Sequence, residues 1–249
     1  MIDQQKVVVV LPAYNAEKTL KKTVEEIPVP PVDEILLVDD ASDDNTIEKA
    51  KELGLKHIIS HTKNKGYGAN QKSCYQKALD MDADIIIMLH PDYQYTPRLI
   101  SPMSHIISAG IYPVVMGSRI LGKGAIRGGM PVYKYYANRL LTFFQNLIMN
   151  QKLSEYHSGY RAFHRNVLEN INLQANSDDF VFDNQMLAQI LIRDYEIAEI
   201  TCPTRYDKTS SSISFLRSLR YGVGVIKTSF QYRLHKWGLA SFKIFKANG

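Results

Sequence analysis

Cysteine is almost missing from this sequence of 249 residues, which has only Cys74 and Cys202, far apart in the chain. Such a pair matches neither the ligand spacing of a zinc site nor the framework of a disulfide-rich domain. We therefore expect both thiols to be small buried side chains. A reducing cytosolic compartment is favoured over secretion.

Long apolar runs are also missing. The run at residues 7–11 is too short for a signal peptide and stops at Pro12. No run approaches the roughly 20 apolar residues that cross a bilayer, so we expect no transmembrane helix. The G-x-G-x-x-G fingerprint and the Walker phosphate loop are absent as well, which argues against a dinucleotide enzyme and a P-loop NTPase.

The composition that is present, 45% hydrophobic and 22% charged, fits one sizeable globular domain. The net charge of +5 is unevenly distributed, because the only acid from Arg205 onward is Asp207. The cations of this basic tail are Arg205, Lys208, Arg217, Arg220, Lys227, Arg233, Lys236, Lys243 and Lys246. Such a tail fits an anionic partner, namely a phospholipid surface, a nucleic acid or a phosphorylated substrate, although a solvated basic face has the same composition.

Short apolar segments alternate with helical patterns along the chain. Strands are predicted at residues 6–11, 34–38, 57–61, 84–89, 113–119, 154–163 and 196–202. Helices are predicted from a cap at Asn15 and over residues 46–53, 71–79, 97–109, 132–149 and, as an amphipathic helix, 178–191. This alternation is typical of βαβ units and a parallel sheet. Glycine-rich residues 122–129 are expected to form a mobile lid.

Polar residues follow the apolar strands directly. Asp39 and Asp40 end one strand, and His90, Asp92 and Gln94 follow another. The last three share one side if strand geometry persists, and ligands of α/β sheets bind beyond the carboxyl ends of strands. The alternative is that these carboxylates only cap helices.

Six segments occur in the order and spacing seen in family 2 glycosyltransferases: VVVVLPAYNAEKTL, ILLVDDASDDNT, NKGYGAN, the strand ending HPDYQ, GSR and SGYRAF. Over residues 7–214 the chain resembles the dolichyl or polyprenyl phosphate sugar synthases of that family. The resemblance implies an α/β GT-A fold, a Rossmann-like mixed sheet flanked by helices. It divides the chain into a catalytic domain, residues 1–213, and a basic amphipathic helical tail, residues 214–249.

The resemblance also implies a nucleotide-sugar site. In the family, the loop after the first strand contacts the base and ribose of the nucleotide. Asp39 matches the aspartate that contacts the nucleoside, and Asp40 lies beside it in the sequence. A carboxylate at a strand end can accept hydrogen bonds from a base or a ribose. The expected site residues are Pro12, Tyr14, Asn15, Glu17, Asp39, Asp40, Asn64, Gly68, Asn70 and Asp92.

A divalent cation, Mg²⁺ or Mn²⁺, is implied at Asp92 and Gln94, which match the family's D-x-D-x-Q segment. Such a hard cation prefers oxygen ligands and would neutralise the departing diphosphate. The first aspartate of the segment is His90 in this chain, and imidazole suits Mg²⁺ poorly. His90 is therefore left outside the metal set.

The acceptor phosphate is implied at Arg119, Lys134, Asn138, Ser158, Arg161 and Arg205. A phosphate monoester has a second pKa near ~6, so its oxygen is already anionic at neutral pH and needs positioning rather than a strong base. Asp92, Arg119 and Asp183 are the catalytic candidates. Glu155 occupies the family's aspartate position before SG and receives a site role with Asp183.

The tail, wound as a helix over residues 214–237, places its apolar side chains in one stripe with cations outside it. The stripe contains Phe215, Leu219, Val223, Ile226, Phe230, Leu234 and Trp237. An apolar stripe with basic flanks is what an interfacial membrane helix requires. The alternative is that the stripe packs on the domain or on another subunit.

These features predict an inverting glycosyltransferase that moves a hexose from a GDP- or UDP-linked nucleotide sugar to a polyprenyl or dolichyl phosphate. The enzyme would be cytoplasmic and peripheral at the inner face of the membrane, and a homo-oligomer is possible. No nucleic-acid partner is expected, because the acidic strand ends repel phosphate without a metal. The alternatives are a soluble saccharide or protein acceptor, and a non-catalytic nucleotide-sugar binding module.

Overall fold

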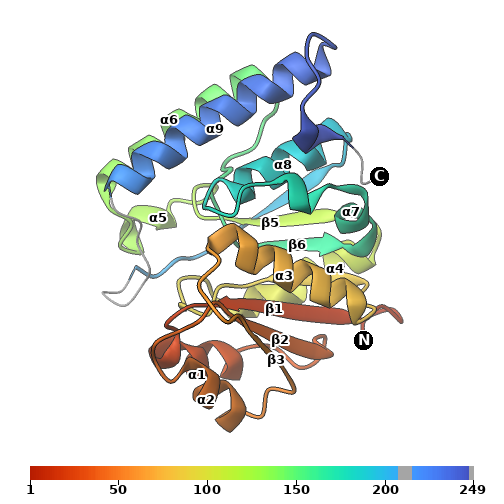
Figure 1. The fold of residues 1–249 in the computed structure, drawn as a ribbon, viewed down its shortest axis with the longest axis vertical. Coiled ribbons are helices and arrows are strands. Elements are labelled where there is room, and N and C mark those ends of the chain that lie inside the picture. The colour runs from red at the N-terminus through yellow and green to blue at the C-terminus, as the bar shows by residue number, and fades with distance from the viewer. Residues whose placement is uncertain (207–214, 247–249) are drawn as a thin grey trace.

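The computed structural model of the chain describes residues 1–206 and 215–246. A mixed seven-stranded sheet lies at its centre in the order β3-β2-β1-β4-β6-β5-β7 (Figure 1). Neighbouring strands run parallel except where β6 pairs antiparallel with β4 and β5. The strands are β1 (Val7–Ala13), β2 (Glu34–Asp39), β3 (His57–Ser60), β4 (Ile85–Met88), β5 (Val114–Ser118), β6 (Arg161–His164) and β7 (Ile197–Thr201). The predicted mixed sheet flanked by helices is confirmed.

Helices cover both faces of this sheet. They are α1 (Glu17–Glu25), α2 (Thr46–Glu52), α3 (Tyr67–Asp80), α4 (Ile100–Ser108), α5 (Gly124–Arg127), α6 (Val132–Met149), α7 (Arg165–Asn170), α8 (Phe182–Ile192) and α9 (Phe215–Lys236). Short 3₁₀ turns occupy Pro97–Leu99, Leu173–Ala175 and Lys243–Phe245. The 132–149 helix is confirmed to the residue, and the glycine-rich segment contains the single helical turn α5.

The buried strands divide their side chains between two apolar cores. Val8 and Val10 of β1 point into the core beneath α3, α7 and α8, whereas Val7 and Val9 point into the core beneath α1, α2 and α4. This division follows from the two-residue repeat of a strand, whose successive side chains face opposite sides of the sheet. Both faces are covered, so the strands are continuously apolar.

Three local predictions are wrong. Asn15 does not cap α1: Ala16 is the N-cap, and Asn15 adopts a positive φ of 51° and accepts a hydrogen bond from the Asp43 amide instead. The helix after NKGYGAN begins at Tyr67, so Gly68 and Asn70 are helical. The strand predicted at 154–163 starts only at Arg161, which leaves Ser158 in the preceding loop.

Two predictions that depended on periodicity are also wrong. α8 is not amphipathic, because it is buried almost all round between the sheet and α9. The strand β4 ends at Met88, and Tyr93 has a φ of +57°, so His90, Asp92 and Gln94 do not share one side of an extended segment. A tight turn replaces the predicted alternation, since a positive φ is incompatible with a strand.

α6 and α9 lie side by side along one edge of the molecule (Figure 1). α6 is inside out: its buried positions include Asn138, Thr142 and Gln145. Its exposed side chains are mostly apolar: Val132, Tyr133, Tyr136, Leu140, Phe143, Phe144 and Leu147. In α9 the predicted stripe is likewise exposed at Leu219, Val223, Ile226, Phe230 and Trp237.

The alternative that the stripe of α9 packs on the domain is therefore wrong. The buried face of α9 is a different one, formed by Val225, Thr228, Ser229 and Tyr232. Phe215 contributes no described side chain, and the expected boundary between residues 213 and 214 lies outside the described residues. Among the described helices, none combines the length and the apolar character needed to cross a membrane.

We expect Ile86→Ala in β4 to lower the free energy of unfolding by about 2–5 kcal/mol, because the fully buried side chain would leave a cavity. Ile111→Ala is the matched control, since Ile111 is 61% exposed, and it should cost less than about 0.5 kcal/mol. Urea denaturation measures both values. Equal losses for the two variants would contradict the described burial of β4.

Candidate active site

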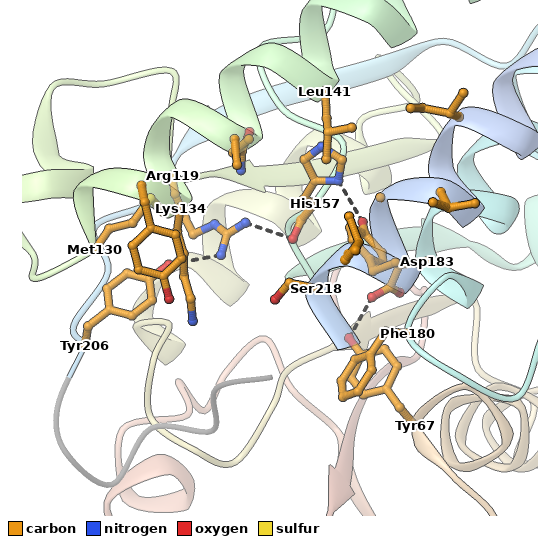
Figure 2. Close-up of a pocket in the computed structure, with 18 of the residues that line it drawn as sticks. Tyr67, Arg119, Met130, Lys134, Leu141, His157, Phe180, Asp183, Tyr206 and Ser218 are labelled. Carbon is orange, nitrogen blue, oxygen red and sulfur yellow. Dashed lines mark hydrogen bonds between the residues drawn. The ribbon is translucent and has the colours of Figure 1, made fainter. Parts of the chain in front are cut away.

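A cavity of about 530 Å³ lies between α6, α9 and the ends of the sheet strands (Figure 2). Its polar residues include Gln94, Arg119, Lys134, Asn138 and Asp183. Its apolar walls come from α6 and α9 and include Ala137, Leu141, Leu219, Val223 and Ile226. The cavity therefore combines charged side chains with apolar helical walls.

Arg119 is held by a buried ion pair with Glu155, whose side chain is fully buried. Its Nε donates to Glu155 Oε1 at 2.8 Å, and its Nη2 donates to the same carboxylate and to the His157 carbonyl oxygen at 2.8 Å. Its Nη1 donates to the Tyr206 hydroxyl at 3.0 Å. Arginine has five N–H donors, so these contacts with described residues leave one Nη1 proton for a ligand.

The charges of this pair are mutually stabilised. Burial opposes ionisation of both groups, but Glu155 together with Tyr95 and Tyr206 offsets it, and the pKa of Arg119 is raised. Arg119 in turn outweighs burial and lowers the pKa of Glu155. Lys134 lines the same cavity, and its pKa is lowered by burial and by the neighbouring Arg119. Asn138 adds a further hydrogen bond to the carboxylate of this ion pair, because its Nδ2 donates to Glu155 Oε1 at 2.7 Å.

Asp183 is fixed at the start of α8, on another side of the cavity. Tyr67 Oη donates to its Oδ2 at 2.6 Å, and Gln71 Nε2 donates to its Oδ1 at 3.2 Å (Figure 2). Arg161 Nη1 lies 3.6 Å from Oδ1. The sequence prediction included Asp183 but missed Tyr67, whose only sequence signal is its place between the two glycines of NKGYGAN.

Arg161 and Ser158 lie behind the cavity rather than on its surface. Arg161 is fully buried, and its guanidinium donates to the carbonyl oxygens of Ser158, Asp183 and Tyr156 at 2.8, 2.7 and 3.1 Å. Ser158 is also fully buried. The described geometry makes Arg161 a support for Asp183, and a direct phosphate contact by either residue stays a prediction.

His90 belongs to the same network as Asp183. Its ring stacks on Tyr67 with centroids 5.3 Å apart, and its Nε2 lies 3.1 Å from Tyr67 Oη. Because the single hydroxyl proton of Tyr67 goes to Asp183, the His90 Nε2 must be the donor to the Tyr67 oxygen. Burial lowers the pKa of His90 against the opposing influence of Asp92 and Asp183. The histidine that replaces the family's first aspartate thus contacts Tyr67, which in turn donates to Asp183.

The expected metal residues follow β4 at its carboxyl end. Asp92 Oδ1 accepts a hydrogen bond from the Gln94 amide at 3.0 Å, which holds the turn, and Gln94 lines the cavity. The described residues contain no cluster of three or more His, Cys, Asp or Glu side chains able to hold a metal ion. One carboxylate and one amide oxygen still suit Mg²⁺ or Mn²⁺, provided that substrate phosphates supply further ligands.

Several nucleotide-site candidates hold loops together. Asp40 accepts hydrogen bonds from the amides of Lys65 and Gly66, each at 2.9 Å, and contacts His61 Nδ1 at 2.7 Å. Asn70 Nδ2 donates to the Val38 carbonyl oxygen at 3.1 Å. These contacts hold the loop before α3 against the end of β2. His61 was not predicted from the sequence, because its partner Asp40 lies 21 residues away in the chain.

The other nucleotide-site candidates surround the ends of β1 and β2. Asp39 is buried and accepts hydrogen bonds from the amide and hydroxyl of Ser42. Glu17 Oε1 accepts from Asn45 Nδ2 at 3.0 Å. Of the remaining candidates, Pro12 is buried within β1, Gly68 is buried in α3, and Tyr14, Asn15 and Asn64 are exposed. Their contacts with a nucleotide stay predictions.

Arg205 is separated from the other acceptor candidates. It lines a second cavity of about 360 Å³ with Glu26, Tyr93 and Arg98, and its guanidinium lies 5.7 Å from the Tyr93 ring centroid. Gln94 lines both cavities. The structure therefore gathers Arg119, Lys134 and Asn138 at one cavity and places Arg205 at its neighbour.

His157 gives the site a pH dependence. Burial lowers its pKa to about 4, so on acidification the unfolded chain takes up a proton before the folded one does. Stability is then lost as pH falls from the unfolded value near ~6.5 toward the folded value, by about 2 kcal/mol between pH 7 and pH 5. We expect His157→Gln to lack this component and exposed His105→Gln to keep it in urea unfolding. Identical slopes for all three proteins would contradict a neutral buried His157.

Several known sugar transferases resemble the chain over most of its length. The UDP-N-acetylglucosamine–dolichyl-phosphate N-acetylglucosaminyltransferase of Methanococcus voltae is 28% identical over 217 residues, covering 81% of this chain and 86% of that protein. The polyprenol monophosphomannose synthase of Mycolicibacterium smegmatis is 25% identical, with 79% and 76% covered. The dolichol-phosphate mannosyltransferase of Pyrococcus furiosus is 26% identical, with 93% and 64% covered.

Among solved structures, glucosyl-3-phosphoglycerate synthase from Mycobacterium tuberculosis shares the fold. Its complex with UDP superposes with a TM-score of 0.71 at 18% identity, covering 96% of this chain and 82% of that one. Its complex with Mn²⁺, UDP and glucosyl-3-phosphoglycerate gives a TM-score of 0.67 at 19% identity. The predicted GT-A fold is thereby confirmed.

A family model matches the part of the chain that contributes Arg119 and α6 to this cavity. The model for glycosyl transferase family 2 aligns with residues 8–171, from β1 to the end of α7 and its following turn. The matched segment contains Arg119, Lys134 and the Asp92–Gln94 turn. The chain is a member of glycosyl transferase family 2.

Proposed function

We propose that the chain is an inverting hexosyltransferase that uses a nucleotide sugar as donor and a polyprenyl phosphate as acceptor. The observation that carries this proposal is the cavity itself: Arg119 and Lys134 line it, and apolar side chains of α6 and α9 form its walls. A phosphate on an isoprenoid chain has the same division into a charged head and an apolar body. The names of the Methanococcus and Mycolicibacterium relatives support the same class of acceptor.

The cations have defined tasks in this proposal. The Glu155 carboxylate orients Arg119, so its remaining Nη1 proton is available to a phosphate oxygen together with Lys134. The acceptor oxygen is already anionic at neutral pH, and the protein needs to align it rather than deprotonate it. It attacks the anomeric carbon as the bond to the diphosphate breaks, and the electron pair leaves with the nucleoside diphosphate.

The donor lies on the side of Asp39 and the Asp92–Gln94 turn. Asp39, at the end of β2, accepts hydrogen bonds from the nucleoside. Asp92 and Gln94 would hold a divalent cation, which would supply positive charge to the diphosphate. Asp183, already oriented by Tyr67, Gln71 and Arg161, accepts hydrogen bonds from the sugar hydroxyls.

We expect the wild-type chain with Mg²⁺ or Mn²⁺ to transfer labelled hexose from a GDP or UDP sugar into an organic-extractable prenyl phosphate. Asp92→Asn should lower kcat on the order of 100-fold, since a neutral amide poorly holds the cation that stabilises the leaving group. Asp80→Asn is the control, because Asp80 is exposed at the C-terminal end of α3, whose N-terminal residue Tyr67 lines the cavity. Full activity in Asp92→Asn, or in excess EDTA, would contradict the metal assignment.

We further propose that α6 and α9 dock the enzyme on an anionic bilayer. Neither helix contains an acidic residue, and their basic residues are Lys134, Arg139, Arg217, Arg220, Lys227, Arg233 and Lys236. Together with the exposed aromatic and aliphatic side chains, this surface complements acyl chains beneath anionic headgroups. The negative surface potential of the cytoplasmic leaflet favours that face.

Vesicle flotation tests this docking surface. Phe143 and Phe230 are 61% and 53% exposed, so Phe143→Glu/Phe230→Glu should lower binding to phosphatidylglycerol vesicles by about tenfold or more. Ile111→Glu, at an exposed apolar position elsewhere, is the control. Binding should also weaken with salt. Failure of wild type to float would overturn the proposal, and a dimer in light scattering would then assign the surface to a second copy of the chain.

A further inference from the structure

The orientation of Arg119 depends on a loop without regular structure. Residues 151–160 form neither helix nor strand, yet this loop supplies both the Glu155 carboxylate and the His157 carbonyl oxygen that bind the guanidinium. A segment of this kind is positioned by its side-chain contacts, because it has no ladder of backbone hydrogen bonds. The contacts of the loop therefore decide where Arg119 points.

Glu199 of β7 accepts hydrogen bonds from Ser154 and from the Glu155 amide. Further contacts come from the two surface helices. On α6, Asn138 donates to Glu155 at 2.7 Å, and Asn146 accepts from the Tyr156 hydroxyl at 2.8 Å. On α9, the Tyr221 hydroxyl lies 2.7 Å from His157 Nδ1, and the two rings meet edge to face with centroids 5.6 Å apart. The loop is thus bound to both helices as well as to β7.

A second contact places α9 against the segment that carries Asp183. Gly224 faces Val181, and a Cβ at Gly224 would lie 2.9 Å from Val181 Cγ2. Real Cβ atoms essentially never approach so closely, so this approach requires glycine. Val181 is two residues before Asp183, and the helix begins immediately after it.

We propose that Tyr221 and Gly224 are positioning residues, through which α9 sets the orientation of Arg119 and Asp183 for the acceptor. α9 then belongs to the catalytic unit rather than to a separable tail. Tyr221 acts through the ring and carbonyl group of His157, and Gly224 acts by allowing α9 to seat against Val181. This inference rests on the proposed transfer to a prenyl phosphate.

Steady-state kinetics with a short, water-soluble prenyl phosphate tests the proposal apart from membrane binding. Tyr221→Phe keeps the ring and loses the hydroxyl, so KM for the acceptor should rise about 3- to 10-fold, as for the loss of one hydrogen bond. KM for the nucleotide sugar should stay unchanged. Tyr232→Phe is the matched control, because Tyr232 is a buried tyrosine of the same helix outside the cavity.

An acceptor KM that stays at the wild-type value in Tyr221→Phe would overturn the proposal. Equal increases for both substrates, or equal effects of Tyr221→Phe and Tyr232→Phe, would also overturn it, because they would indicate general loosening of α9. Calorimetry with the same prenyl phosphate separates this failure from that of the proposed function. A wild-type chain that neither binds nor glycosylates the compound overturns both.

The second contact has its own test by compensation. Gly224→Ala should raise the acceptor KM about 3- to 10-fold by displacing α9, whereas Val181→Ala removes the methyl group that the new Cβ meets and should restore most of the loss in the double variant. Additive losses in the double variant would overturn the role of Gly224. Thermal unfolding of each variant, monitored by circular dichroism, verifies that the compared proteins are folded.

Discussion

The buried ion pair between Arg119 and Glu155 is the interaction on which the candidate site depends. It joins the end of β5, the irregular loop before β6, α6 through Asn138 and the segment after β7 through Tyr206. Removing one partner of a buried pair costs about 3–5 kcal/mol, because the other charge is left without compensation. The same pairing holds the guanidinium in one orientation beside the cavity.

A second constraint is the reversal of polarity in α6. A helix on a water-soluble surface ordinarily buries its apolar stripe, whereas α6 directs Asn138 and Gln145 inward and Phe143 and Leu147 outward. Of the inward amides, Asn138 donates to Glu155, whereas Gln145 Nε2 contacts Met149 Sδ of the same helix. The outward side chains lie on a helix that packs beside α9, whose side chains Val223 and Phe230 are also exposed.

Strongly patterned features of the fold were predictable. The continuous apolar strands, the alternation of strands and helices and the 132–149 helix follow from local side-chain periodicity. The predicted cap at Asn15 was wrong, because Asn15 instead accepts a hydrogen bond from the Asp43 amide of the next strand–helix loop. The prediction that α8 is amphipathic was wrong for a similar reason, since α9 packs on the face of α8 that would otherwise be exposed to water.

The sequence by itself determined the family pattern, the acidic strand ends and the apolar and basic character of the last described helix. Only the tertiary structure decided which charged residues meet. It brought Arg119, Lys134 and Asp183 to one cavity, set Arg205 in another and enclosed Arg161 behind Asp183. The physical reason is that charge and periodicity are local properties of a chain, whereas burial and hydrogen-bond partners depend on segments that meet only after folding.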